Sequence, residues 1–162
     1  MTLDWLPPEM REAVSPLSDV QIVTACLFGE ARSEPIEGLA AVANALRNRL
    51  RTGRFGDSLA AVALKPKQFS CWTPAGGAKN YPLVLGFARA LGAQRPIIDP
   101  VERQCVLIAH GIVDDYLKDN THGATHYFAP AAMIPKGRVP DWAVGAILSA
   151  KYGRHVFYRG VK

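Results

Sequence analysis

The fold is decided by residues 18–53, SDVQIVTACLFGEARSEPIEGLAAVANALRNRLRTG, which carry the signals of two consecutive helices. Ser18 and Gln21 have the spacing of a capping box, in which two side chains cap the first turn of a helix. Pro35 fits the first turn of a second helix, and Gly53 is a typical stop signal. Apolar residues follow both start signals at helical spacing. We therefore expect helices over residues 19–33 and 35–52, joined by a tight connection.

The rest of the chain is predicted to be mainly helical. Further helices are expected at residues 59–64 (capped by Asp57 or Ser58), 83–94, from Pro100 to about Tyr116, and from Asp141 to just before Gly153. Long loops are expected at residues 67–82 and 120–140, and a short strand at residues 155–159. Loops of this length inside a small domain are usually functional. We predict an α+β, mainly helical single domain over residues 1–162, with residues 1–18 as an N-terminal extension.

The composition is that of an ordinary folded domain, with 49% hydrophobic and 20% charged residues. A net charge of +5 favours anionic polymers as partners. No nucleic acid is expected, because the basic residues are scattered and carry no known binding signature. The densest basic cluster is Arg47, Arg49, Arg51 and Arg54, which we interpret as the solvated face of a helix and the turn after it.

The sequence shows no signal for membrane insertion or secretion. No apolar run reaches the length of a membrane span, and residues 1–12 lack the basic start and apolar core of a secretory signal. We therefore expect synthesis in the cytoplasm without a signal peptide.

The cysteines and histidines do not predict a metal site. Cys26, Cys71 and Cys105 are odd in number and lack C-x-x-C spacing, which argues against a disulfide framework and a zinc site. His122 and His126 have the spacing of two ligands on a helix, but glycine follows the first histidine where the metalloprotease motif has glutamate. We expect no metal and no cofactor.

Glu30 continues the apolar face of the first helix, three residues after Leu27 and seven after Val23. Residues at this spacing share a helix face, so the carboxyl group is expected to point inward. Burial raises the pKa of a carboxylic acid, which keeps it protonated as a general acid requires. The pattern alone fits equally well with a carboxyl group that turns to solvent. Glu34, where the second helix begins, is expected to stay ionised as a structural anion.

Four stretches of the chain carry a family resemblance when they are taken together. They are Leu27-Phe-Gly-Glu30-Ala-Arg-Ser-Glu34-Pro with the later Gly38, Ala41-Val-Ala-Asn and Arg47-Asn-Arg49; Gln68-Phe69-Ser70-Cys71-Trp72; Thr125-His-Tyr-Phe128; and Gly153-Arg-His155-Val-Phe-Tyr158. In this order they resemble the cell-wall hydrolase family that includes the spore cortex-lytic enzymes of the SleB and CwlJ type. The resemblance implies a lysozyme-like fold and cleavage of the β-1,4 bond between N-acetylmuramic acid and N-acetylglucosamine, commonly as a lytic transglycosylase. It also implies that Glu30 is the catalytic residue.

Two features depart from the family's pattern. Ser33 stands where the family usually has glycine, and the chain lacks the export signal and wall-binding module of many secreted relatives. The second departure suits a phage lysis or virion protein that acts on the cell wall better than a spore-cortex role.

A sugar cleft is expected around the two long loops, because flat aromatic faces cover the apolar faces of sugars while amides and hydroxyls bind their rims. The expected substrate-binding residues are Gln68, Phe69, Ser70, Trp72, His126, Tyr127 and Trp142. The expected partner is the peptidoglycan glycan strand, bound by a monomer. Two alternatives stay open: a hydrolytic muramidase, and a non-catalytic wall-binding or phage structural protein.

Overall fold

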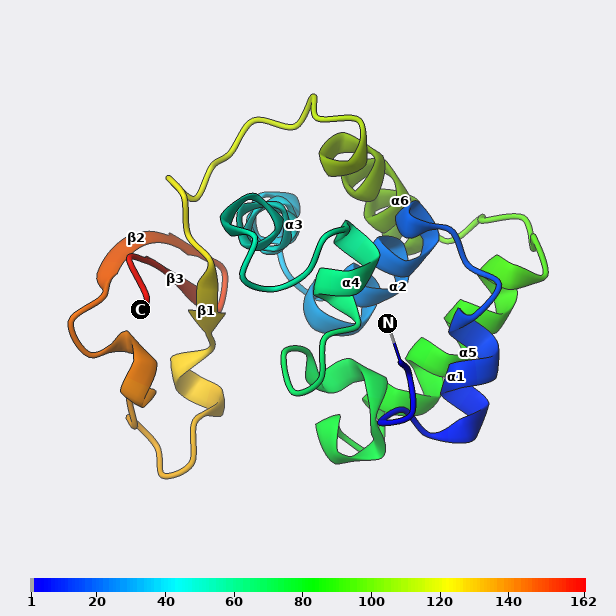
Figure 1. The fold of residues 1–162 in the computed structure, drawn as a ribbon, viewed down its shortest axis with the longest axis horizontal. Coiled ribbons are helices and arrows are strands. Elements are labelled where there is room, and N and C mark those ends of the chain that lie inside the picture. Colours follow the sequence, from blue (N-terminus) through cyan, green and yellow to red (C-terminus); the bar gives the residue numbers. More distant parts are fainter. Residues whose placement is uncertain (1) are drawn as a thin grey trace.

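In the computed structural model, residues 2–162 form a bundle of helices with a small sheet on one side (Figure 1). The helices are α1 (Pro8–Val14), α2 (Asp19–Ala31), α3 (Ile36–Thr52), α4 (Leu59–Ala63), α5 (Asn80–Gly92) and α6 (Pro100–Val113). The strands are β1 (His126–Phe128), β2 (Ile147–Tyr152) and β3 (His155–Arg159). None of the helices in residues 2–162 is long and apolar enough to cross a membrane.

Helix α2 forms the centre of the bundle. It packs against α3, α4, α5 and α6, and residues 22–27 are buried without interruption. A helix that is buried on every side belongs to the interior of a domain. The C-terminal end of α2 carries Glu30, so this residue is placed by the most constrained helix of the fold.

The predicted helix boundaries agree with the structure where a local cap defines them. Ser18 and Gln21 form the expected capping box of α2. Helix α3 ends at Gly53, whose φ of +67° lies in the left-handed region that glycine adopts at low cost. Ser58 caps α4 by accepting a hydrogen bond from the backbone N–H of Ala61 at 3.1 Å, and Asp99 caps α6 in the same way.

Helix α1 was not foreseen from the sequence. Leu6, Met10 and Val14 are at most 2% exposed and belong to the core, and α1 packs against α5. Tyr81 on α5 also donates a hydrogen bond to Glu9 at 2.8 Å. The stretch expected as an N-terminal extension is therefore packed into the bundle.

The sheet corrects the prediction for the C-terminal part of the chain. The strands are antiparallel in the order β1-β3-β2, with Tyr127 opposite Phe157. Residues 141–152 were expected to be helical, which is wrong: only a single turn, Asp141–Ala143, is helical, and β2 follows. The turn ends at Val144, whose backbone is extended, and pairing with β3 then satisfies the backbone of β2.

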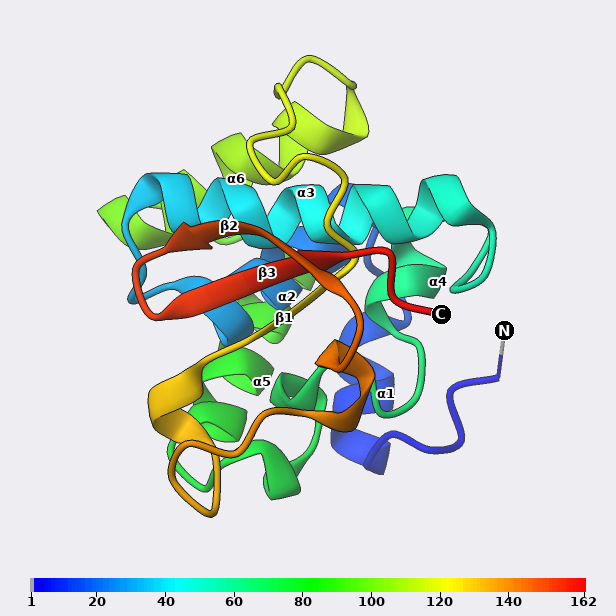
Figure 2. The same cartoon turned by 90° about the vertical axis from the view of Figure 1, so that its left-hand side faces the viewer.

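The expected end of α6 is also wrong. The helix stops at Val113, so Tyr116 lies beyond it and is 62% exposed. Figure 2 shows the sheet lying alongside α3, which both β1 and β2 contact.

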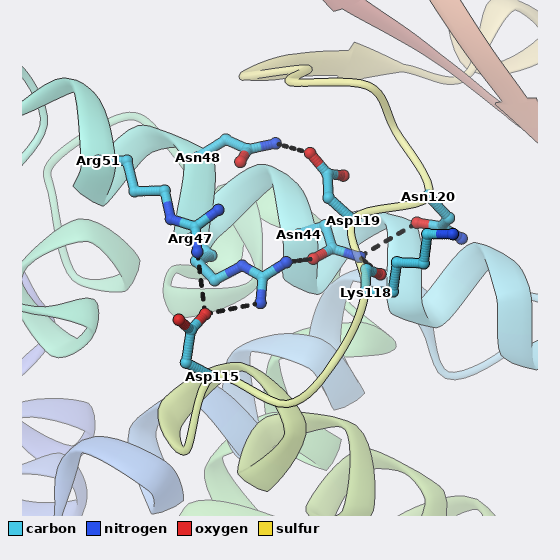
Figure 3. Close-up of polar contacts among 8 residues, drawn as sticks. All are labelled: Asn44, Arg47, Asn48, Arg51, Asp115, Lys118, Asp119 and Asn120. Carbon is cyan, nitrogen blue, oxygen red and sulfur yellow. Dashed lines mark hydrogen bonds and ion pairs between the residues drawn. The ribbon is translucent and has the colours of Figure 1, made fainter.

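The polar side chains of α3 hold the segment that leads into β1 (Figure 3). Asn44 donates a hydrogen bond to the carbonyl oxygen of Lys118 at 3.1 Å, and Arg47 contacts Asp115 at 3.0 Å. Asn48 donates to Asp119 at 3.0 Å. These contacts fix residues 115–124 against α3 and thereby set the position of β1.

The interpretation of the basic cluster as a solvated face is therefore wrong for its first two members. Arg47 and Arg49 are each only 5% exposed. Both guanidinium groups find polar partners in the segment that crosses α3, which allows a charged residue to be buried.

Candidate active site

Two neighbouring cavities meet at Glu30. The first has a volume of about 410 Å³ and is lined by Glu30 together with the loop that follows α4 and by Tyr127 of β1. The second has a volume of about 350 Å³ and is lined by Glu30, by residues that follow β1, and by Arg154 and His155 of the β2–β3 hairpin. Among the described residues, Glu30 is the one that lines both cavities.

The Glu30 carboxyl group is held by hydrogen bonds from two other parts of the fold. The backbone N–H of Cys71 donates to Oε1 at 3.2 Å, and the hydroxyl group of Tyr127 donates to Oε2 at 3.3 Å. Burial raises the pKa of Glu30, and this effect outweighs the hydrogen bonds and the positive charge of Arg49, which lower it. The inward orientation expected from the helix pattern is confirmed, and the raised pKa favours the protonated acid.

Glu34 has a different environment from Glu30. Its side chain is 1% exposed, and it accepts hydrogen bonds from the backbone N–H and from Nε of Arg154 at 2.9 and 2.7 Å. Burial raises the pKa of Glu34, but the contacts with Arg154 and the charge of His155 outweigh it, so the pKa is lowered. The contacts with Arg154 support the expectation that Glu34 is a structural anion. Glu34 joins the start of α3 to the β2–β3 hairpin.

Four of the expected substrate-binding residues line the first cavity with Glu30. They are Gln68, Phe69, Ser70 and Tyr127. Gln68, Phe69 and Ser70 lie in the loop that follows α4, and Tyr127 projects from β1 towards Glu30. Phe69 is only 3% exposed, so it forms the floor of the cavity and offers little surface to a ligand.

Three other expected binding residues lie elsewhere. Trp72 is 0% exposed and donates a hydrogen bond from Nε1 to the carbonyl oxygen of Ala63 at 2.8 Å, so it is a core residue and the expectation that it binds sugar is wrong. His126 and Trp142 contact each other at a ring-centroid distance of 5.0 Å and line neither of the two cavities that meet at Glu30. Successive residues of a strand face opposite sides of a sheet. Because Tyr127 faces Glu30, its neighbour His126 faces away.

Five residues of the first cavity were missed by sequence reasoning. Trp5 precedes α1 and Arg49 lies near the end of α3, whereas Lys67, Thr73 and Ala75 lie between α4 and α5. Lys67 has a φ of +63°, a left-handed conformation that is uncommon for residues other than glycine. Arg49 belongs to one of the stretches that carry the family resemblance, and Lys67 begins the long loop that was expected to be functional, but neither residue was singled out by its own pattern.

The two cavities contain one carboxyl group that can act as an acid. Among residues 2–162, Glu30 is the only carboxyl group that lines either cavity. The described part of the chain also brings together no group of three or more side chains of the kind that bind metal ions. Glu30 can supply proton transfer at this point, next to aromatic and polar side chains of the cavity wall.

Solved structures define the class of fold. The chain is similar to the catalytic domain of the germination-specific lytic transglycosylase SleB from Bacillus anthracis, with a TM-score of 0.57 and 24% identity over 87% of this chain and 93% of that chain. It is also similar to the catalytic domain of the Bacillus cereus SleB protein, with a TM-score of 0.58 and 24% identity over 87% of this chain and 89% of that chain. The predicted mainly helical α+β, lysozyme-like fold is confirmed.

The chain belongs to the Cell Wall Hydrolase family, whose sequence profile matches residues 33–158. The spore cortex-lytic enzyme of Halalkalibacterium halodurans is 28% identical over 141 residues, which are 86% of this chain and 34% of the relative. The spore cortex-lytic enzyme of Oceanobacillus iheyensis is 40% identical over 53 residues, or 33% of this chain and 19% of the relative. The chain thus spans about a third or less of these relatives. The profile match begins after Glu30. The evidence for a role of Glu30 is therefore its position in the two cavities.

Proposed function

We propose that this domain is a peptidoglycan glycosidase that cleaves the β-1,4 bond between N-acetylmuramic acid and N-acetylglucosamine, and that it acts as a lytic transglycosylase. The observation that carries the proposal is the position of Glu30, a carboxyl group with a raised pKa at the junction of two cavities. Sugar units bound in the two cavities would place the glycosidic bond that joins them beside this acid. Membership of the Cell Wall Hydrolase family supports the glycan as substrate.

Glu30 would act in both steps of the reaction. As an acid it gives its proton to the glycosidic oxygen, and the bond from that oxygen to C1 of the muramic acid breaks. As a carboxylate it then takes the proton from the C6 hydroxyl group of the same sugar, whose oxygen bonds to C1 and closes a 1,6-anhydro ring. The proton is returned to Glu30, and no water is consumed.

The absence of a second carboxyl group supports transglycosylation over hydrolysis. An inverting glycosidase needs a base roughly 6.5–9.5 Å from the acid, and a retaining one usually needs a carboxylate about 5 Å away. Neither cavity offers such a group in the described residues, and Glu34 is occupied by Arg154. Intramolecular attack by the C6 hydroxyl group needs no second carboxylate and benefits from a tethered nucleophile. The similar SleB protein of Bacillus anthracis is a germination-specific lytic transglycosylase, which supports the same choice.

The proposal is tested with Glu30→Gln, which keeps the shape of the side chain and removes the proton. We expect loss of nearly all activity in a turbidity assay on purified peptidoglycan, with an unchanged circular dichroism spectrum. Glu37→Gln is the matched control, because Glu37 is an exposed residue outside both cavities and should keep wild-type activity. Activity of Glu30→Gln within a few-fold of wild type would refute the assignment of the acid. A wild-type protein that binds the wall without cleaving it would favour the non-catalytic alternative.

A further inference from the structure

Arg49 is a buried cation in the wall of the first cavity. It is 5% exposed, and its Nε donates a hydrogen bond to the carbonyl oxygen of Thr125 at 2.6 Å. Its guanidinium carbon lies 5.2 Å from the ring centroid of Phe55 and 5.0 Å from that of Phe69. The helix, the two rings and the carbonyl group therefore hold the guanidinium group in one place beside Glu30 and Tyr127.

The charge of Arg49 is not neutralised by an ion pair. Within residues 2–162, no carboxylate oxygen lies within 4.0 Å of its nitrogen atoms, whereas Arg47 on the same helix pairs with Asp115. The Nη1 atom of Arg49 is buried and has no hydrogen-bond partner in this part of the chain. A buried charged group without full pairing is costly unless something compensates for it. Glu30, Tyr127 and Cys26 are the ionisable groups that act on Arg49.

We propose that Arg49 is a positioning residue whose unpaired positive charge stabilises the carboxylate of Glu30 after the acid has given up its proton. This inference rests on the proposed function, in which Glu30 must exist as an acid in the first step and as a base in the second. An acid that is only desolvated would resist ionisation. A fixed cation in the cavity wall stabilises the carboxylate form of Glu30. Burial still keeps Glu30 protonated before the reaction begins.

The other groups around Glu30 do not supply this charge. Tyr127 of β1 and Cys71 after α4 are neutral at working pH, because burial raises the pKa of both groups. Cys26 of α2 can supply no positive charge, because a cysteine is either neutral or anionic. Across the second cavity, burial lowers the pKa of His155, and Arg154 is already paired with Glu34.

Lys67 is the other cation of the first cavity, but it is exposed and its charge is screened by water. Within the described residues, Arg49 is therefore the buried cation that lines the same cavity as the acid. Its effect opposes that of burial, since the positive charge lowers the pKa of Glu30.

The test compares neutral and charged replacements of Arg49. In Arg49→Gln and Arg49→Met the charge is lost, so the titration midpoint of the Glu30 carboxyl group should move to higher pH. In Arg49→Lys the charge remains and the shift should be less than half as large. Arg47→Gln is the matched control, because it removes an equally buried arginine of α3 that lines neither cavity. It should leave the midpoint unchanged.

The midpoint is read in two ways. Carbon-13 NMR of glutamate-labelled protein, assigned with Glu30→Gln, follows the carboxyl group directly and does not require turnover. The alkaline limb of the pH profile of kcat/KM should move in parallel, and kcat at the optimum should fall in the neutral variants. Circular dichroism and thermal melting identify the variants that fold. One folded neutral variant, either Arg49→Gln or Arg49→Met, is enough for the test.

A midpoint that stays at the wild-type value in a folded neutral variant would overturn the inference. An equal shift in Arg49→Lys or in Arg47→Gln would also overturn it, because the effect would then come from altered packing. If wild-type protein cleaves no glycan, the proposed function fails, while the NMR midpoint still decides whether Arg49 controls the ionisation of Glu30.

Discussion

Replacing Glu34 by glutamine tests whether this residue is a structural anion. Its carboxylate accepts two hydrogen bonds from Arg154, from the backbone N–H and from Nε, and its side chain is 1% exposed. Glutamine has nearly the same shape but no charge, and only one of its terminal atoms can accept a hydrogen bond. The substitution should therefore loosen the β2–β3 hairpin from the start of α3 without changing the cavity at Glu30.

The magnitude follows from the two bonds. A hydrogen bond to a charged group contributes about 1.5–3 kcal/mol to stability. Glutamine can keep one weakened bond, and Arg154 is 65% exposed, so water can solvate its released guanidinium group. We expect the free energy of unfolding to fall by about 2 kcal/mol. For a domain of this size, that corresponds to a drop in Tm of roughly 4–8 °C.

The pH dependence gives a sharper signature than the size of the loss. The pKa of Glu34 is lowered from its ordinary value of 4.5, because the contacts with Arg154 and His155 outweigh the effect of burial. A group with a lowered pKa stabilises the fold above its ordinary value and loses this effect as the pH falls through the lowered pKa. The difference in stability between wild type and Glu34→Gln should therefore be constant from neutral pH down to about pH 5 and shrink below it.

The assay is urea unfolding at a series of pH values, followed by circular dichroism. Glu37→Gln is the control, because Glu37 lies three residues after Glu34 in the first turn of α3 and is exposed. It should change stability little at any pH. A stability difference for Glu34→Gln that persists unchanged at low pH would refute the ionic role. A loss of lytic activity without a loss of stability would mean that Glu34 takes part in the chemistry.

Three further predictions concern single contacts. Gly153→Ala should destabilise the fold, because Gly153 has a φ of +52° and an added Cβ would overlap Oε2 of Glu34. The loss should exceed the roughly 1–2 kcal/mol that alanine costs in a left-handed conformation. A melting curve close to that of wild type would contradict this. Tyr127→Phe removes the hydroxyl group that donates a hydrogen bond to Glu30. We expect kcat to fall roughly tenfold and the alkaline limb of the pH profile of kcat/KM to move to higher pH. A profile identical to that of wild type would show that the contact has no effect. Trp72→Phe should lower stability by about 2 kcal/mol in urea unfolding and leave KM unchanged, because Trp72 is fully buried; a raised KM in the folded variant would place it in the substrate site.

The helices could be predicted where short-range signals define them. The capping box of Ser18 and Gln21, the stop at Gly53 and the cap at Asp99 are all confirmed. Each depends on residues within one helical turn, so no knowledge of the rest of the fold is needed.

The sheet could not be predicted completely, because its pairing is not local information. Residues 155–159 were expected as a strand, which is confirmed, but residues 147–152 were expected as part of a helix. A short apolar run fits a helix or a strand equally well when it is read by its pattern alone. Its hydrogen bonds to β3 decide the matter.

The candidate site was predictable to the extent that it lies on a helix. Glu30 could be placed from the apolar face of α2, but its partners Cys71 and Tyr127 lie 41 and 97 residues away in the chain. Arg49 was predicted to face solvent, because clustered arginines usually do. Its burial depends on a hydrogen bond to Thr125, which is distant in the sequence. Trp72 was misread for the opposite reason, since a loop aromatic can be a core residue.

The central claim is that Glu30 acts alone as acid and then as base in a lytic transglycosylase. Mass spectrometry of the soluble muropeptides from a digest of purified peptidoglycan tests it most directly. The account predicts that wild-type products end in 1,6-anhydromuramic acid, one water lighter than muramidase products, and that Glu30→Gln releases almost none. Products that carry only reducing ends would contradict it, because water would then be the nucleophile and another group would have to position it.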